Sequence, residues 1–194
     1  MERLTKVAKF RYKTVVEDID YGDNRNINKN PLKRFSEYDF IKNNESILIT
    51  GSTGVGKSYM ALALGYQACS LGYKVMYFNT HKLFTKLKTS KADGSYMKEI
   101  SKLEKQDLLI LDDFGFRALG SVNRCFFMEI IEDRHGKKAT IIASQLPVEA
   151  WHQIIGGQTI ADAILDRIVH SGHRFPFVVY SGWVTVASIA NVAS

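Results

Sequence analysis

Short apolar runs alternate along the chain with longer segments of helix-forming residues. The runs are rich in Ile, Leu and aromatic residues and have the length of strands that are buried on both faces. They predict strands over 47–50, 74–79, 107–113, 139–144 and 174–179. The segments between them predict helices over 58–71, 81–90, 96–105, 123–135, 148–155 and 159–170, and Thr80 is the expected cap of the second helix.

Strands that alternate with helices are typical of an α/β domain built on a parallel sheet. We expect this domain over residues 45–180, which contain every predicted strand. Residues 1–44 have poor periodicity, so we expect an extended or partly ordered lead-in with one short helix around 32–40. Residues 181–194 carry no charge and form an atypical C-terminal tail.

The composition, 45% hydrophobic and 24% charged over 194 residues, is ordinary for a soluble globular protein. The formal net charge of +6 favours an anionic partner such as nucleic acid. The chain begins without an apolar signal region and has no run of 18 apolar residues, so we expect a cytoplasmic protein with no membrane contact. Cys69 and Cys125 lack metal-ligand spacing and are expected to be buried free thiols.

The most informative motif is Gly-Ser-Thr-Gly-Val-Gly-Lys-Ser at 51–58, between a predicted strand and a predicted helix. This is the phosphate-loop pattern, in which backbone N–H groups at a helix N-terminus face a phosphate chain. Lys57 is expected to reach the β- and γ-phosphates of ATP, and the Ser58 hydroxyl to bind Mg²⁺. The expected nucleotide-binding residues are Gly51, Ser52, Thr53, Gly54, Val55, Gly56, Lys57, Ser58 and Tyr59.

A pair of carboxylates, Asp112 and Asp113, ends the strand predicted over 107–113. The carboxyl ends of parallel strands lie at the sheet edge where ligands bind, which is also where the phosphate loop lies. We expect Asp112 to hold Mg²⁺, directly or through water, and Asp113 to orient and activate the attacking water. On its own, an Asp-Asp pair would indicate no more than a turn after a core strand.

Two further elements extend the predicted site. Ser144 and Gln145 follow the next strand, where polar side chains would lie beside the γ-phosphate, although a simple loop start explains them equally well. Arg167 lies in a late helix and is a candidate for an arginine that acts on the nucleotide of a neighbouring subunit. The residues alone favour a salt bridge between Arg167 and Asp162 or Asp166.

Lysines gather after the second predicted strand, on the next predicted helix and in a later loop, and would give DNA binding through the phosphate backbone, with little sequence preference. A solvated surface is the alternative explanation for any one of them. The lysines are Lys82, Lys86, Lys88, Lys91, Lys98, Lys102, Lys105, Lys137 and Lys138.

Together with the phosphate loop, four segments resemble the IstB helper ATPases of insertion sequences: Leu-Leu-Ile-Leu-Asp-Asp-Phe-Gly at 108–115, and the motifs at 129–135, 143–148 and 161–170. These are AAA+ proteins similar to the DnaC helicase loaders. The resemblance implies a three-layer P-loop NTPase (AAA+) fold with a central parallel β-sheet flanked by helices. It also implies Mg²⁺-dependent ATP hydrolysis, homo-oligomers, DNA binding and assistance to a transposase.

The resemblance also assigns roles. It favours Ser144 and Gln145 as sensors of the γ-phosphate, Arg167 as the arginine that acts in trans, and Arg174 as a second candidate for that role. Two alternatives remain open at this point. One is a DnaC-like helicase loader, and the other is a nucleotide-binding interaction module that does not hydrolyse ATP.

Overall fold

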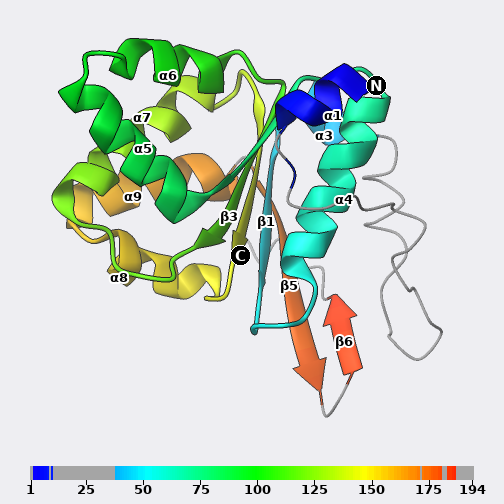
Figure 1. Cartoon of the computed structure of the whole chain (residues 1–194). Helices are drawn as coiled ribbons and strands as arrows, with labels where there is room; N and C mark the ends of the chain where they lie inside the picture. Colours follow the sequence, from blue (N-terminus) through cyan, green and yellow to red (C-terminus); the bar gives the residue numbers. More distant parts are fainter. Residues whose placement is uncertain (1, 9, 11–37, 171, 181–182, 187–194) are drawn as a thin grey trace.

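The central sheet contains six strands among the described residues, in the order β2-β3-β4-β1-β5-β6 (Figure 1). All neighbours are parallel except β5 and β6, which are antiparallel. The computed structural model describes residues 2–8, 10, 38–170, 172–180 and 183–186, with side chains for 3–8, 10 and 38–169. The strands are β1 (Ser46–Gly51), β2 (Val75–Asn79), β3 (Leu108–Phe114), β4 (Ala139–Ser144), β5 (Gly172–Tyr180) and β6 (Trp183–Val186).

Helices cover both faces of this sheet and give a three-layer structure (Figure 1). One face is covered by α1 (Glu2–Ala8), α3 (Asp39–Lys42) and α4 (Lys57–Ser70). The other face is covered by α5 (Thr80–Ala92), α6 (Tyr96–Glu104), α7 (Ser121–Arg134), the 3₁₀ turn η3 (Val148–Ala150), α8 (Trp151–Ile155) and α9 (Gln158–His170). Among the described residues, no helix is long and apolar enough to cross a membrane.

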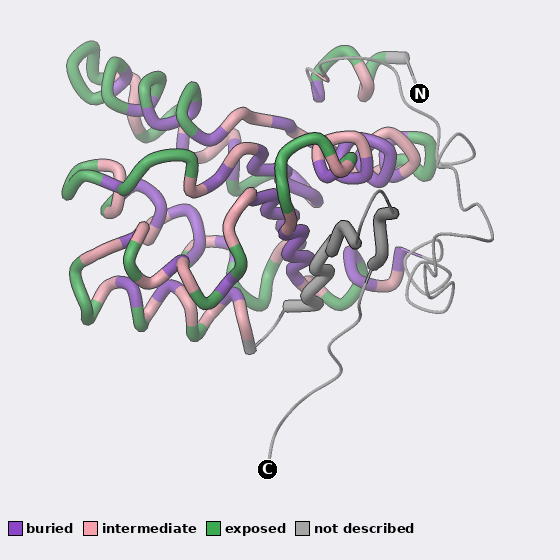
Figure 2. Tube along the Cα trace, turned by 90° about the horizontal axis from the view of Figure 1, so that it is seen from below, coloured by how far each residue is buried: buried purple, intermediate pink, exposed green. Residues whose placement is uncertain are grey.

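Alternate residues of each central strand pack into two different cores. Leu108 and Ile110 contact the core beneath α4, whereas Leu109 and Leu111 contact the core beneath α5 to α9. All four side chains are fully buried, and Figure 2 shows buried positions along the sheet and on the inward side of the helices. Side chains alternate between the faces of a strand, so a continuous apolar run is what burial on both faces requires.

The predicted α/β fold and its strands are confirmed, with small differences at the ends. The helix predicted over 148–155 is divided into η3 and α8. The predicted cap of the second helix is wrong, because Asn79 rather than Thr80 caps α5 and accepts a hydrogen bond from the backbone N–H of Lys82 at 3.2 Å. The expectation of two buried thiols holds for Cys69 only, since Cys125 is exposed on α7.

Two described elements lie in the lead-in at 1–44 and in the tail at 181–194. Helix α1 falls within the lead-in, and its Leu4 and Ala8 pack against the core beneath α4. Strand β6 falls within the tail and pairs with β5 through Val184 opposite Val179. The helix expected around 32–40 lies mostly outside the described residues, and α3 begins at its end.

Candidate nucleotide-binding site

The loop between β1 and α4 has the backbone shape that the phosphate-loop sequence predicts. Gly54 and Gly56 have φ values of 85° and 93°, in the left-handed region that glycine adopts without strain. Apart from the glycine itself and its chain neighbours, no heavy atom lies within 4 Å of a Cβ placed on either residue, so the space beside both glycines is open. Helix α4 begins at Lys57, and its first N–H groups lack partners within the helix. The loop therefore forms an open cradle of N–H donors that suits a phosphate chain.

Lys57 crosses this loop and is 8% exposed. Its ammonium group donates a hydrogen bond of 2.6 Å to the backbone oxygen of Ser52. Burial lowers the pKa of Lys57, and the nearby charges of Asp112 and Asp113 oppose this effect. Phosphate oxygens at the loop would supply a stronger acceptor for the same ammonium group than a carbonyl does.

Asp112 lies at the carboxyl end of β3, is only 1% exposed and accepts hydrogen bonds on both carboxylate oxygens. Its Oδ1 accepts from the Ser58 hydroxyl and from the backbone N–H of Asp113, both at 2.9 Å. Its Oδ2 accepts from the Tyr77 hydroxyl at 2.7 Å. The Asp112 backbone oxygen accepts from the Thr80 hydroxyl at 2.8 Å. These donors fix the carboxylate directly beside the first turn of α4.

Asp113 sits in a bulge of β3. Leu111 is opposite Ile142 and Phe114 is opposite Ser144, so β3 has one more residue than β4 in this interval. Asp113 also has φ of 56°, an unusual value for a residue with a side chain. Bulges redirect side chains near functional sites. Here the Asp113 carboxylate accepts a hydrogen bond of 2.7 Å from the Asn79 side-chain amide.

Gln145 reaches the phosphate loop, whereas Ser144 stabilises its own loop. The Gln145 side-chain oxygen accepts a hydrogen bond of 3.0 Å from the Thr53 hydroxyl. Ser144 is fully buried, and its hydroxyl accepts from the backbone N–H of Leu146 at 3.1 Å. The Leu146 oxygen in turn accepts from the indole of Trp151, which is also fully buried. The loop after β4 is thus anchored on α8 while Gln145 contacts the cradle.

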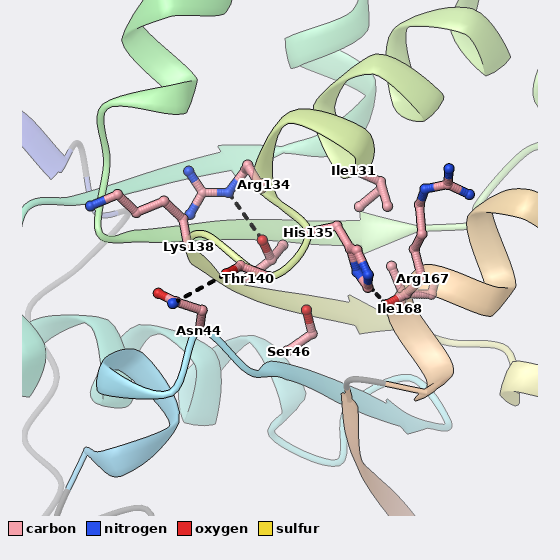
Figure 3. Close-up of a pocket in the computed structure, with 10 residues that line it drawn as sticks. Asn44, Ser46, Ile131, Arg134, His135, Lys138, Thr140, Arg167 and Ile168 are labelled. Carbon is pink, nitrogen blue, oxygen red and sulfur yellow. Dashed lines mark hydrogen bonds between the residues drawn. The ribbon is translucent and has the colours of Figure 1, made fainter.

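Arg167 lies at the opposite edge of the sheet from the phosphate loop. It lines a recess with Ser46 at the start of β1 and Thr140 near the start of β4 (Figure 3). β1 ends at Gly51, and six residues of strand span roughly 16 Å. The Arg167 guanidinium pairs with Glu132 at 2.5 Å and donates to the Ala163 oxygen at 2.8 Å.

Asp162, one of the expected partners of Arg167, lies 3.1 Å from His152 instead. Tyr59, another predicted site residue, is half-buried in the first turn of α4. Arg174 is placed only by its backbone, near the start of β5 and opposite Leu48 of β1, and its side chain lies outside the described part.

Sequence reasoning missed three residues that bond to Asp112 or Asp113: Tyr77 within β2, Asn79 at its end and Thr80 at the start of α5. The available signal was their position, because polar residues that end a strand of a parallel sheet lie at the ligand-binding edge. The sequence did not show that β2 is the direct neighbour of β3.

The residues present fit a magnesium nucleotide. Mg²⁺ in nucleotide sites is bound through one or two protein oxygens together with phosphate oxygens and water. The hydroxyl of Ser58 and the carboxylate of Asp112 supply such oxygens next to the cradle. In the part of the chain that the structure describes, no group of three or more His, Cys, Asp or Glu side chains forms a metal site of its own. A site that needs phosphate oxygens to complete it is consistent with that finding.

Fold and site together define a P-loop protein of the AAA+ class. Among solved structures, DnaI is similar with a TM-score of 0.73 and 21% identity over 90% of this chain and 92% of that one. The DnaC helicase loader is similar with a TM-score of 0.68 and 20% identity over 91% of this chain and 99% of that one. A DnaA structure bound to AMPPCP and single-stranded DNA has a TM-score of 0.71 and 20% identity, over 89% of this chain and 52% of that one.

Residues 1–181 match the family described as IstB-like ATP binding protein, and the chain belongs to that family. It is 44% identical over 169 residues to the insertion sequence ATP-binding protein y4pL of Sinorhizobium fredii, covering 87% of this chain and 69% of the relative. It is 40% identical over 148 residues to the ATP-binding protein of insertion sequence IS1162 of Pseudomonas fluorescens, covering 76% and 64%. The chain thus spans about two thirds of the length of these relatives.

Proposed function

We infer that this chain hydrolyses ATP with Mg²⁺ and uses the cycle to help a transposase engage DNA. The observation that carries the catalytic part is the cluster of Lys57, Ser58, Asp112 and Asp113 beside an open phosphate loop. Phosphoryl transfer needs charge neutralisation on the phosphates and a positioned water, which these groups can supply. The relatives are named as ATP-binding proteins of insertion sequences, which supports a role in assisting a transposase.

The roles of the chain's own residues follow from their placement. Lys57 would bind the phosphates, and Ser58 and Asp112 would hold Mg²⁺, which when bound neutralises charge on the phosphates. Asp113 would accept the proton of the attacking water once its hydrogen bond from Asn79 is released. Gln145 would sense the γ-phosphate through its contact with the loop at Thr53.

The test of this proposal separates binding from turnover. Lys57→Ala should lose most of its ATP affinity in calorimetry, because the charge that faces the phosphates is gone. Asp113→Asn should bind ATP as the wild type does and lose turnover by about 100-fold, within the range of general base catalysis. Wild-type turnover in Asp113→Asn would refute the role of that residue. A wild-type chain that binds ATP without hydrolysing it, with or without DNA, would instead support the interaction module.

DNA binding is proposed for the surface of α5 and α6, and the structure divides the lysines there into two groups. Lys86 and Lys102 both pair with Glu99, and the Lys91 ammonium lies 4.8 Å from the centre of the Tyr96 ring. The other group is exposed and has no ion-pair partner among the described residues: Lys82, Lys88, Lys98 and Lys105. This second group is therefore better suited to contact DNA phosphates.

The lysines of α5 do not share one face of the helix. Lys82 and Lys86 are one turn apart, whereas Lys88 is two residues beyond Lys86 and projects to another side. Lys88→Glu and Lys98→Glu should weaken binding to all DNA sequences alike. Each change should reduce the slope of log affinity against log salt concentration by about one, because one fewer counterion is released from the DNA. Lys42→Glu on the opposite face of the sheet is the charge-matched control. Fluorescence anisotropy at several salt concentrations provides the measurement, and loss of binding in the control alone would contradict this assignment.

A DnaC-like helicase loader is the second candidate function. The similarity to DnaC and DnaI in fold supports it, whereas the sequence relatives support the transposition role. Stimulation of ATP turnover by a purified transposase from the same insertion sequence, but not by a replicative helicase, would favour the first function. The reverse result would favour the second.

A further inference from the structure

A buried tyrosine hydroxyl donates to the Asp112 oxygen that does not contact Ser58 of the phosphate loop. Tyr77 lies on β2, is 6% exposed and belongs to the core beneath α4. Its register partner on β3 is Ile110, two residues before Asp112. Since residues two apart on a strand share a face, the Tyr77 hydroxyl meets Asp112 on the α4 side of the sheet.

The two carboxylate oxygens of Asp112 accept hydrogen bonds from different donors. The hydroxyl donates to Oδ2 at 2.7 Å, while Oδ1 accepts from Ser58 and from the Asp113 backbone at 2.9 Å. A carboxylate that was held on one oxygen only could turn about its last bond. With Tyr77 in place, Oδ1 is directed toward Ser58, the residue that faces the phosphates.

We propose that Tyr77 is a positioning residue for magnesium: its hydroxyl fixes the Asp112 carboxylate so that Oδ1 and the Ser58 hydroxyl form one metal-binding pair. This inference rests on the proposed role of Asp112 in binding Mg²⁺. Groups that orient a metal ligand contribute to affinity without touching the metal, and their loss typically costs 10- to 100-fold in metal affinity.

Loss of the Tyr77 hydroxyl would be energetically costly because the Asp112 carboxylate is buried. Asp112 is 1% exposed, so a charged oxygen without a donor could not turn to solvent for compensation. Removal of the Tyr77 hydroxyl would make the present orientation of the carboxylate unfavourable. The carboxylate would then rotate to share its remaining donors, and Oδ1 would leave the position beside Ser58.

The test uses Tyr77→Phe, which removes one oxygen and keeps the ring that fills the core. Tyr96→Phe is a matched control, because the Tyr96 hydroxyl also donates to a carboxylate, that of Glu129 between α6 and α7, away from the phosphate loop. Thermal unfolding is followed with AMPPCP as the nucleotide over a range of Mg²⁺ concentrations. No hydrolysis is needed for this measurement, so it reports binding alone.

The expected result is an approximately tenfold rise in the Mg²⁺ concentration that gives half of the full stabilisation in Tyr77→Phe. The affinity for AMPPCP without Mg²⁺ should stay within twofold of the wild type, and Tyr96→Phe should behave as the wild type. In an Asp112→Asn background, Tyr77→Phe should add no further rise, because the group that it positions is already changed.

Two results would overturn the role of Tyr77 while leaving the proposed metal role of Asp112 intact. One is an unchanged Mg²⁺ dependence in Tyr77→Phe while Asp112→Asn shifts it. The other is an equal loss of AMPPCP affinity with and without Mg²⁺, which would show a general effect on folding. If Asp112→Asn itself leaves the Mg²⁺ dependence unchanged, the proposed metal role of Asp112 fails and the role of Tyr77 fails with it.

Discussion

The side-chain amide of Asn79 donates a hydrogen bond of 2.7 Å to the carboxylate of Asp113. The same side chain uses its oxygen to cap α5 by accepting from the backbone N–H of Lys82. One asparagine therefore joins the start of a helix to the proposed catalytic carboxylate. In the proposed reaction Asp113 would leave this amide to act on water, and Asn79 would hold it in a resting position until nucleotide binds.

Asn79→Asp should retain the helix cap and remove the donor, because both side chains carry an oxygen acceptor and only asparagine has the amide. The new carboxylate would lie beside Asp113 and repel it. We expect turnover to fall about tenfold, equivalent to roughly 1.4 kcal/mol, with ATP affinity unchanged. Steady-state turnover and calorimetry measure the two quantities. Asn79→Ala loses both the helix cap and the hydrogen bond to Asp113, so comparing it with Asn79→Asp separates the two effects. An unchanged rate in Asn79→Asp would show that this contact has no part in the reaction.

Burial lowers the pKa of Lys57 below the ordinary lysine value of 10.5. Lys57 should therefore lose its proton at a lower pH than an exposed lysine, and its charge is the one proposed to face the phosphates. ATP affinity should be full at neutral pH and should fall as pH rises toward 10. Arginine keeps its charge over this range, so Lys57→Arg should remove the alkaline decline even if its affinity is lower throughout. Calorimetry between pH 7 and 10 tests this, and a decline of the same size in Lys57→Arg would assign it to another group.

The two cysteines should differ in reactivity. Cys69 is buried, and burial raises the pKa of its thiol to about 11, whereas Cys125 is exposed. The thiolate is the reactive form, so at pH 8 Cys69 is protected from modification both by its burial and by the raised pKa of its thiol. An aromatic disulfide reagent should modify one thiol of the folded protein rapidly and the second only after unfolding. Cys125→Ser should abolish the rapid phase and Cys69→Ser should preserve it; rapid modification of Cys125→Ser would contradict the described packing.

Arg167 should act on the nucleotide of a neighbouring subunit. It lies near the amino-terminal ends of the strands, whereas the phosphate loop of its own subunit follows the carboxyl-terminal end of β1. Arg167→Ala should bind ATP normally and lose turnover, since the lost charge stabilises the transition state. Glu132 pairs with this arginine and would have to release it for the proposed action in trans.

Mixing variants tests whether Arg167 acts in trans. Arg167→Ala keeps an intact phosphate loop, and Lys57→Ala keeps an intact arginine. Their mixture should recover part of the activity that neither shows alone. Failure to recover activity in co-assembled mixtures would indicate that Arg167 serves only as the partner of Glu132.

The sequence by itself determined the parallel sheet and the position of the phosphate loop. Apolar runs separated by helical segments left few other arrangements, and the motif at 51–58 encodes its own backbone shape through Gly54 and Gly56. The approach of Asp112 to Ser58 was also predictable, because Asp112 lies near the carboxyl end of β3 and Ser58 follows β1, and these strands end on the same side of the sheet. These features depend on local pattern and on the general geometry of α/β sheets.

Tertiary structure alone decided which groups hold the two carboxylates and which partner Arg167 has. Tyr77 and Asn79 reach Asp112 and Asp113 only because β2 pairs with β3 in one register and because β3 bulges at this point. Glu132, 35 residues before Arg167, pairs with it because α7 packs beside α9, while Asp162, one of the two expected partners, lies beside His152. Such contacts join residues that are distant in the chain, and no local pattern of hydrophobic and polar positions encodes them.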